Sequence, residues 1–198
     1  MKDLNIIISG VGGQGNILLE RIIGKCAIAA DLKVTASDTF GATQRGGSVI
    51  SQIRLGKKVR SSLIPRGKCD VILGLEPGEA LRTAGKYMAD NALVIVNTAP
   101  VLPAKVKIGE WEYPPVETIV QVLKKFSDNV IELHATALAN EVAGDNRYTN
   151  MVMAGAFAAQ NMLPVNTATY KTAIKEATGR FAEKNLSAFD AGFQQCIA

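Results

Sequence analysis

The sequence predicts an α/β fold in three layers: a mostly parallel, Rossmann-like sheet with an inserted antiparallel hairpin, and a C-terminal helical layer. Short apolar runs alternate with stretches of helical periodicity as far as residue 133. The apolar period changes to two in residues 48–55, and no strand pattern returns from Ala135 onward. With 47% apolar and 6% aromatic residues, the chain is expected to fold as a single domain over residues 1–198.

The first elements follow a strand–helix–strand order. Residues 4–9 form a β-branched apolar run that stops at glycines, which predicts a strand buried on both faces. Residues 16–31 carry apolar side chains four residues apart, as one face of a helix requires. Residues 33–37 predict a second strand that ends at Asp38. This order predicts a right-handed parallel crossover.

Later elements are predicted in the same way. The hairpin is expected to pair residues 48–55 with residues 59–64 across a turn at residues 56–58. Further strands are expected at residues 71–75, 92–98 and 130–133, with a short one near residues 106–108. Helices are expected from Pro77 onward, at residues 116–126 and 151–160, and twice in the tail. The small side chains around Gly155 should allow another helix to approach closely.

Cysteine usage and hydropathy bound the class of protein. Cys26, Cys69 and Cys196 are far apart, so the sequence predicts neither a disulfide framework nor an iron–sulfur ligand set. No apolar run approaches the roughly 18 residues of a membrane span, and Met1 leads directly into a strand instead of a signal peptide. We therefore expect a cytoplasmic protein with no membrane partner.

Basic residues are concentrated in one window. No acidic residue lies between Asp38 and Asp70, and this window accounts for the whole formal net charge of +4. Its basic residues are Arg45, Arg54, Lys57, Lys58, Arg60, Arg66 and Lys68. Such a field either faces an anion or is the solvated edge of a hairpin. Because no aromatic residues are interleaved with these charges, nucleic acid is not an expected partner.

The strongest local motif is a glycine loop between the first strand and the first helix. Gly10, Gly12, Gly13 and Gly15 enclose Gln14 and precede Asn16, in a G-x-G-x-x-G spacing. Glycines permit a tight turn and let the free amides of a helix start approach an anion. Asn16 replaces the lysine that a triphosphate loop needs. Two interpretations stay open: a dinucleotide or other anion site with Asp38 near a ribose, and glycines that serve only packing.

A second cluster, Gln44, Arg45, Gly46, Gly47 and Ser48, opens the basic window. It supplies backbone donors, a guanidinium and a hydroxyl, which suit phosphate or carboxylate groups. Taken alone, the cluster would be interpreted as an ordinary turn into a hairpin.

Other candidate residues carry weaker signals. His134, at the end of an apolar strand, is interpreted as a hydrogen-bonded core residue and not as a base. Asp70 and Glu76 flank a strand and are interpreted as capping or solvated. Trp111 is either a partly buried loop aromatic or an anchor for a protein contact. A single histidine and scattered cysteines predict no metal site.

The two glycine clusters and residues 150–156, in this order and at this spacing, resemble the gamma-type subunit of the 2-oxoacid:ferredoxin oxidoreductases. In size and pattern the chain is most similar to the small (beta) subunit of the indolepyruvate branch. The resemblance spans nearly the whole chain. In that family a partner chain carries thiamine diphosphate and iron–sulfur clusters, decarboxylates the 2-oxoacid and reduces ferredoxin, while the acyl group passes to coenzyme A.

The resemblance implies a non-catalytic subunit that is inactive and cofactor-free in isolation. It would help to form the coenzyme A side of an active site whose thiamine diphosphate and iron–sulfur clusters belong to a larger partner subunit. Carried over by position, its ligand-binding residues would be Gly10, Gly12, Gly13, Gln14, Gly15, Asn16, Gln44, Arg45, Gly46, Gly47 and Ser48. The alternatives are a free-standing nicotinamide oxidoreductase and a non-enzymatic, anion-binding regulatory module.

Overall fold

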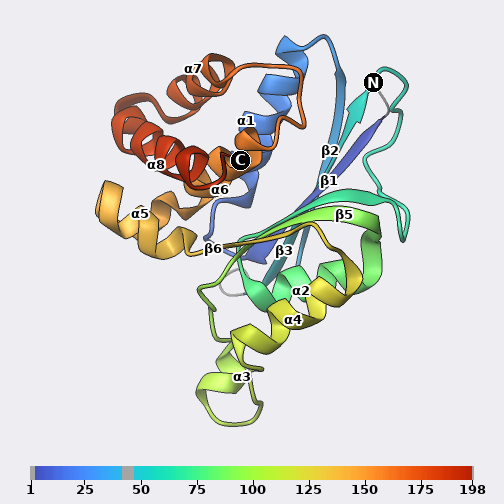
Figure 1. Cartoon of the computed structure of the whole chain (residues 1–198), viewed down its shortest axis with the longest axis vertical. Helices are drawn as coiled ribbons and strands as arrows, with labels where there is room; N and C mark the ends of the chain where they lie inside the picture. The colour runs from blue at the N-terminus through green and yellow to red at the C-terminus, as the bar shows by residue number, and fades with distance from the viewer. Residues whose placement is uncertain (1–2, 42–46, 198) are drawn as a thin grey trace.

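The computed structural model describes residues 3–41 and 47–197, and it confirms the predicted α/β class. Six strands form one sheet in the order β2-β3-β1-β4-β5-β6 (Figure 1). The strands are β1 (Leu4–Val11), β2 (Lys33–Phe40), β3 (Ser48–Gly56), β4 (Cys69–Gly74), β5 (Met88–Asn97) and β6 (Val130–Leu133). Neighbours β1, β4, β5 and β6 are parallel, whereas β3 is antiparallel to both β1 and β2.

Helices cover both faces of the sheet (Figure 1). On one face lie α1 (Asn16–Ala29), α5 (Ala135–Ala143), α6 (Thr149–Ala159), α7 (Thr167–Thr178) and α8 (Ala182–Gln195). The other face carries α2 (Pro77–Tyr87) and α4 (Val116–Phe126). The short helix α3 (Ala104–Lys107) projects beyond one end of the sheet, and the 3-10 turns η1 (Asn146–Tyr148) and η2 (Gly179–Phe181) lead into α6 and α8.

Strands β1 and β4 and the second half of β5 are buried on both faces, as their apolar runs predict, whereas the outer strand β2 is largely exposed. Ile6 and Ile8 of β1 belong to the core under α1 and α6, whereas Ile7 belongs to the core under α2 and α4. Alternate side chains of a strand point to opposite faces, so a strand between two helical layers must be apolar at every position.

The predicted partner of β3 was wrong. Residues 59–64 form no strand, and the antiparallel partners of β3 are β1 and β2. A strand has only two hydrogen-bonding edges, so none is left for residues 59–64. Side chains hold this segment instead: the Ile64 amide donates to Oε1 of Gln52 at 2.8 Å, and Nη1 of Arg54 donates to the Ser61 carbonyl at 3.2 Å.

The short strand predicted near residues 106–108 was also wrong. The chain forms helix α3 there, with the Ile108 amide bonded to the Ala104 carbonyl at 3.1 Å. This segment lies outside the sheet, so no neighbouring strand was available to pair with its alternating pattern.

The C-terminal helical layer packs as the small residues predict. A Cβ on Gly155 of α6 would lie 2.0 Å from the Phe189 carbonyl oxygen of α8. A Cβ on Gly192 of α8 would lie 2.0 Å from the Val152 carbonyl oxygen of α6. The two backbones therefore meet at a crossing that only glycine permits on both sides.

The sheet has two opposite ends along the direction of its strands. We call the edge where β1, β4, β5 and β6 end the carboxyl edge, and the edge where they begin the amino edge. Because β3 runs the opposite way, its first residue, Ser48, pairs with Val11 at the carboxyl edge, and Leu55 pairs with Leu4 at the amino edge.

Candidate functional site

The first glycine cluster forms the turn from β1 into α1 at the carboxyl edge. Gly13 and Gly15 have φ values of 100° and 80°, which favour glycine. Gly15 caps α1 and offers no side chain to its free amides, and no acidic residue follows in the first turn. The positive end of α1 therefore faces outward at this edge without a negative side chain of its own.

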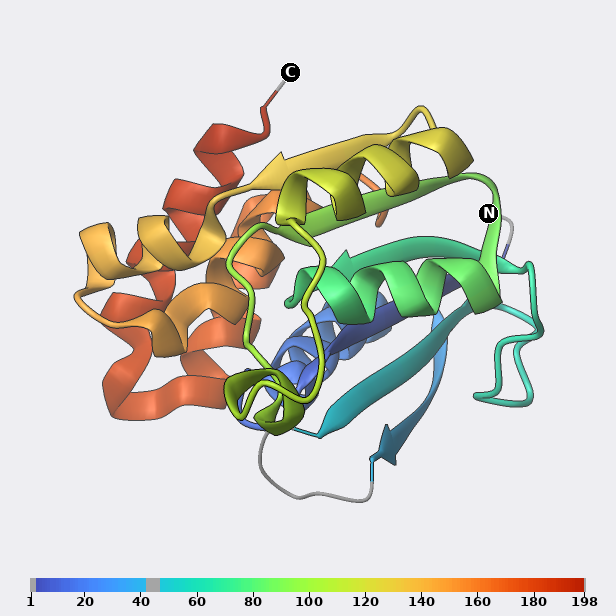
Figure 2. The same cartoon turned by 90° about the horizontal axis from the view of Figure 1, so that it is seen from below.

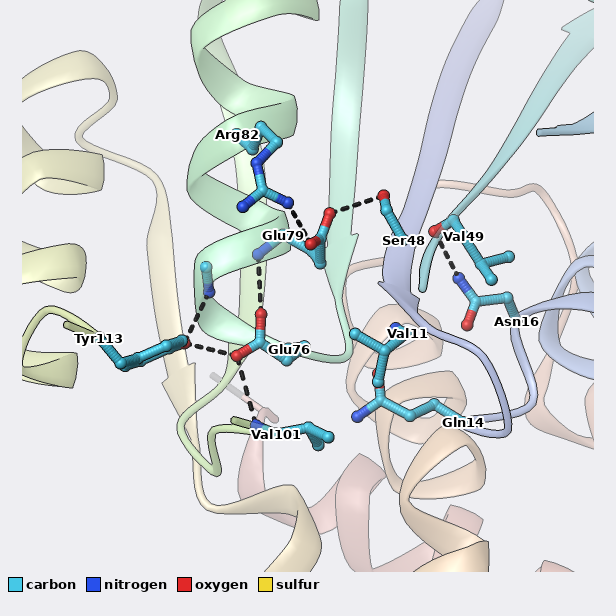
Figure 3. Close-up of polar contacts among 11 residues, drawn as sticks. Val11, Gln14, Asn16, Ser48, Val49, Glu76, Glu79, Arg82, Val101 and Tyr113 are labelled. Atoms are coloured by element: carbon cyan, nitrogen blue, oxygen red, sulfur yellow. Dashed lines mark hydrogen bonds and ion pairs between the residues drawn. The ribbon is translucent and has the colours of Figure 1, made fainter. Parts of the chain in front are cut away.

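Gln14 shapes this turn by bridging two strand ends. Its Oε1 accepts the Val11 amide at 2.8 Å (Figure 3). Its Nε2 donates to the Leu75 carbonyl at 3.0 Å. Val11 ends β1, which continues into α1 on one face of the sheet, and Leu75 follows β4, which continues into α2 on the other face, so Gln14 lies where the two connections diverge. Doubly wound sheets bind ligands at such a crevice. Here the Gln14 side chain occupies part of it.

Asn16 ties the start of α1 to the strands beneath it. Its side chain is only 4% exposed, and Nδ2 donates to the carbonyls of Ile8 at 3.3 Å and Val49 at 3.2 Å. Asn16 therefore fixes the helix start against β1 and β3, and its ligand-binding role stays a prediction. Its amide side chain is already engaged inside the protein.

The second glycine cluster meets the first at the same edge, as far as it is described. The Gly12 amide donates to the Gly47 carbonyl at 2.9 Å, and Oγ of Ser48 donates to Oε2 of Glu79 at 2.7 Å. Gln44, Arg45 and Gly46 lie outside the described residues. Gly47 and Ser48 thus lie beside the glycine loop, and a ligand-binding role for both clusters stays a prediction.

Two cavities flank the glycine loop. The first, which we call the Phe40 cavity, has a volume of about 680 Å³ and is lined by the loop together with Ile17, Phe40, Gly41 and Val49. No charged side chain of the described residues lines it. An anion there would meet the backbone amides at the start of α1, with apolar walls around it.

The second, which we call the Thr136 cavity, lies on the other side of the loop with a volume of about 320 Å³. It is lined by Gly12 to Gln14, residues 99–101, Thr136, Arg147 and Thr149, among others. Arg147 is the one cation among the described residues of this lining, and its Nε pairs with Asp145 at 2.9 Å. Thr136 and Arg147 were not among the predicted site residues. Thr136 follows the end of β6 closely, so the shared edge of the parallel strand ends could have pointed to it, whereas Arg147 of η1 lies far from any strand end.

A buried network connects the carboxyl edge to the long loop before α4. The Glu76 side chain is 2% exposed and caps α2, because Oε2 accepts the Glu79 amide at 2.8 Å. Oε1 accepts the Tyr113 hydroxyl, which in turn accepts the Gly78 amide at 3.0 Å (Figure 3). Burial and the neighbouring carboxylate of Glu76 raise the pKa of Tyr113, so its hydroxyl stays a donor. The capping interpretation of Glu76 is confirmed.

The other singled-out side chains have local roles. Asp70 accepts the Asn5 amide at 2.8 Å. His134 is exposed, so its interpretation as a core residue was wrong. Its Nδ1 shares a hydrogen bond of 2.6 Å with the Thr98 hydroxyl, which joins the ends of β5 and β6. Trp111 is 59% exposed, and the centre of its ring lies 4.6 Å from Nζ of Lys105.

Asp38 does not stand where a ribose-binding acid would. Strand β3 separates β2 from β1, whereas the dinucleotide fold has these strands side by side. Asp38 accepts the Ser51 hydroxyl and faces Glu20 of α1. Burial, together with the charge of Asp38, raises the pKa of Glu20 to about 7.

The basic window does not gather around the glycine loop. Arg54 pairs with Asn5 at the start of β1, with Nε bonded to Oδ1 of Asn5 at 2.9 Å, and Nδ2 of Asn5 donates to the Lys68 carbonyl at 2.7 Å. The connection of residues 57–68 runs from the end of β3 to the start of β4, so its cations belong to the amino edge. These cations are exposed and β3 separates them from the glycine loop, which favours the solvated interpretation of the window over a field that faces an anion at that loop.

The cysteines do not form a cluster-ligand set. Cys26 lies in the core under α1 and Cys69 in the core on the other face of the sheet. Burial raises the pKa of each thiol to about 12, which opposes the thiolate form that metals require. Among residues 3–41 and 47–197, no group of three or more potential ligand side chains could hold a metal ion. Within the same residues, no helix is long and apolar enough to cross a membrane.

Comparison with known proteins gives the family. Residues 5–195 match the pyruvate ferredoxin/flavodoxin oxidoreductase domain family. The chain is 39% identical to the indolepyruvate oxidoreductase subunit IorB of Archaeoglobus fulgidus over 98% of this chain and 96% of that one.

Solved structures show the same fold. The gamma subunit of a keto/oxoacid ferredoxin oxidoreductase from Geobacter sulfurreducens superposes with a TM-score of 0.71 at 22% identity, over 98% of both chains. A 2-oxoglutarate:ferredoxin oxidoreductase from Magnetococcus marinus, solved with 2-oxoglutarate, coenzyme A and succinyl-CoA bound, gives 0.70 at 24% identity. This superposition covers 99% of the present chain and 31% of the longer Magnetococcus marinus chain.

These matches set aside the free-standing nicotinamide enzyme and the regulatory module. The chain belongs to the pyruvate ferredoxin/flavodoxin oxidoreductase family, as a subunit of a 2-oxoacid:ferredoxin oxidoreductase.

Proposed function

We propose that the chain is the small, non-catalytic subunit of an indolepyruvate:ferredoxin oxidoreductase. The complex would oxidatively decarboxylate indolepyruvate, or another aryl pyruvate, to the acyl-CoA and reduce ferredoxin. The observation that carries this proposal is the 39% identity to the Archaeoglobus fulgidus subunit across nearly all of both chains. The match over residues 5–195 supports one gamma-type domain. The free, separated cysteines are those of a protein from a reducing compartment such as the cytoplasm.

The thiamine diphosphate and iron–sulfur clusters of the complex belong, in this proposal, to a larger subunit. The separation of Cys26 and Cys69 by the sheet supports this division, since the two thiols cannot ligate one cluster. When bound there, thiamine diphosphate supplies the carbanion chemistry of decarboxylation. The role of this chain is to shape the side of the active site that receives coenzyme A.

The carboxyl edge is the part of the chain that we assign to coenzyme A. The start of α1 and the Gly12–Gly47 contact lie between two cavities, and the Phe40 cavity combines backbone amides with apolar walls. A phosphate-bearing ligand with an apolar arm suits such a surface. Arg45 follows Gly41 by four residues in the sequence and would add the cation that the described lining of this cavity lacks.

Reconstitution tests the proposal. The isolated chain should be colourless and inactive, whereas the chain combined with its larger subunit should reduce ferredoxin with indolepyruvate and coenzyme A. Pyruvate and 2-oxoglutarate serve as competing substrates in the same assay. A complex that prefers 2-oxoglutarate would contradict the indolepyruvate assignment, and turnover by the isolated chain would contradict the non-catalytic role.

A further inference from the structure

The loop between β5 and α4 exposes large apolar side chains that the chain's own core does not use. We call residues 98–115 the α3 loop. Ile108 and Trp111 are 69% and 59% exposed, and Val101 and Leu102 are 37% and 39% exposed. Helix α3 in this loop buries none of its residues. Apolar surface of this kind at one projection is typical of a contact with another protein.

The α3 loop is held in a fixed shape in spite of its exposure. At its base, the buried carboxylate of Glu76 accepts the Val101 amide at 3.4 Å and the Tyr113 hydroxyl (Figure 3). At its tip, the amides of Glu110 and Trp111 both donate to the Lys105 carbonyl, at 2.9 and 3.2 Å. A preformed projection loses little conformational entropy when it binds.

The tip, residues 104–112, carries two lysines and two glutamates, so its formal charge is zero. Nζ of Lys105 lies 3.8 Å from Oε2 of Glu110 and 4.6 Å from the centre of the Trp111 ring. The indole is therefore presented against a cation that already has a partner. A pocket that accepts this tip should be apolar, with no need for a strong opposite charge.

The loop also stands beside the candidate coenzyme A site. Its residues 99–101 line the Thr136 cavity together with the glycine loop. Figure 1 shows α3 projecting beyond the carboxyl edge, at which α1 begins, and Figure 2 views the molecule from that end. A protein that covers the base of the α3 loop, at residues 99–101, would border the Thr136 cavity as well.

We propose that the α3 loop is the docking surface for the larger subunit, with Trp111 and Ile108 entering an apolar pocket of that subunit. This inference rests on the proposed function. Continuity favours this occupant over a second copy of the chain: one wall of the Thr136 cavity is the loop itself, so the subunit that completes the active site must reach it.

The experiment uses the fact that Trp111 is the only tryptophan in the chain. The chain labelled with 5-fluorotryptophan should give one ¹⁹F resonance with the solvent isotope shift of an exposed indole. Addition of the unlabelled larger subunit should move this resonance and abolish the isotope shift. Trp111→Ala should weaken binding of the larger subunit about 30-fold or more, the effect of losing a buried aromatic anchor.

Phe126→Ala is the matched control, because Phe126 is 55% exposed and ends α4 at the amino edge. It should change the affinity less than twofold, and neither variant should change the melting temperature appreciably. If the wild-type chain binds the larger subunit while the ¹⁹F resonance stays unchanged and Trp111→Ala binds equally well, the docking proposal is wrong and the proposed function stands. If the wild-type chain does not bind the larger subunit, both are wrong. A resonance that moves when the chain alone is concentrated would assign the loop to a second copy.

Discussion

The two edges of the sheet differ in how they handle charge and backbone. At the amino edge, exposed cations from residues 57–68 surround an irregular connection that side chains such as Gln52 and Arg54 hold in place. At the carboxyl edge, the backbones of the two glycine clusters are joined by the Gly12–Gly47 hydrogen bond, and a cavity lies on each side of the glycine loop. The edge with most of the window's basic charge is therefore not the edge with the candidate site.

This difference shows that a high density of basic residues along the sequence is a weak guide to an anion site, because one strand can carry neighbouring residues to opposite edges of the sheet. One strand length separates Ser48 from Leu55, and it moves the chain from one edge to the other. An anion at the carboxyl edge would be held by amides at a helix start, whose direction is fixed by the fold. The amino-edge cations instead lie in an exposed connection, where water solvates their charge.

The largest contrast between the edges is expected from glycine substitution. Gly15 and Gly67 both have positive φ, at 80° and 68°. A Cβ on Gly15 would lie 2.3 Å from Nδ2 of buried Asn150, whereas a Cβ on Gly67 at the amino edge would meet nothing closer than 4.0 Å. Gly15→Ala should lower the free energy of unfolding by about 2–3 kcal/mol, and Gly67→Ala by about 1 kcal/mol. Urea denaturation measures both, and equal losses would contradict the close packing at the glycine loop.

A second contrast concerns coenzyme A. Arg45→Ala should raise the KM for coenzyme A about tenfold in the assembled complex, because a charge-assisted contact to phosphate is lost. The matched control is Lys58→Ala, a cation of the same window at the amino edge, which should change that KM less than twofold. Steady-state kinetics at fixed 2-oxoacid concentration measures both. Equal effects from the two variants would mean that the whole window serves the ligand.

The smallest effect is expected at the pair formed by Glu20 and Asp38. Because the pKa of Glu20 is raised from 4.5 to about 7 in the folded chain, its ionisation destabilises the fold progressively between these pH values, and fully above pH 7. Glu20→Gln should therefore add about 1 kcal/mol, or about 2–4 °C in Tm, at pH 8 and almost nothing at pH 4. Glu141→Gln, at an exposed position, is the control. A gain from Glu20→Gln that does not vary with pH would contradict the raised pKa.

Local patterns predicted most of the fold. The buried strands, the Pro77 start of α2 and the small residues of α6 were all found from spacing, because each depends on residues near in sequence. The failures were non-local. The alternating pattern of residues 48–55 identified a strand but could not say that β1 and β2 would take both of its edges.

In the candidate site, too, the local features could be predicted from the sequence and the long-range contacts could not. The glycine spacing placed the loop at a helix start, and the Gly12–Gly47 bond joins it to the second cluster. The contact of Glu76 with Tyr113, 37 residues away, left no sequence signal, because one glutamate and one tyrosine suit many surroundings. Thr136 and Arg147 line the Thr136 cavity only because α5 and η1 fold against the carboxyl edge, which is a tertiary arrangement.

Hydrogen–deuterium exchange of the assembled complex, compared with the isolated chain, tests most directly whether the carboxyl edge faces the shared active site. Amides in residues 10–18 and 98–115 should exchange more slowly in the complex, while those in residues 57–68 should be unchanged. Protection of residues 57–68, with residues 98–115 exchanging as fast as in the free chain, would contradict the account.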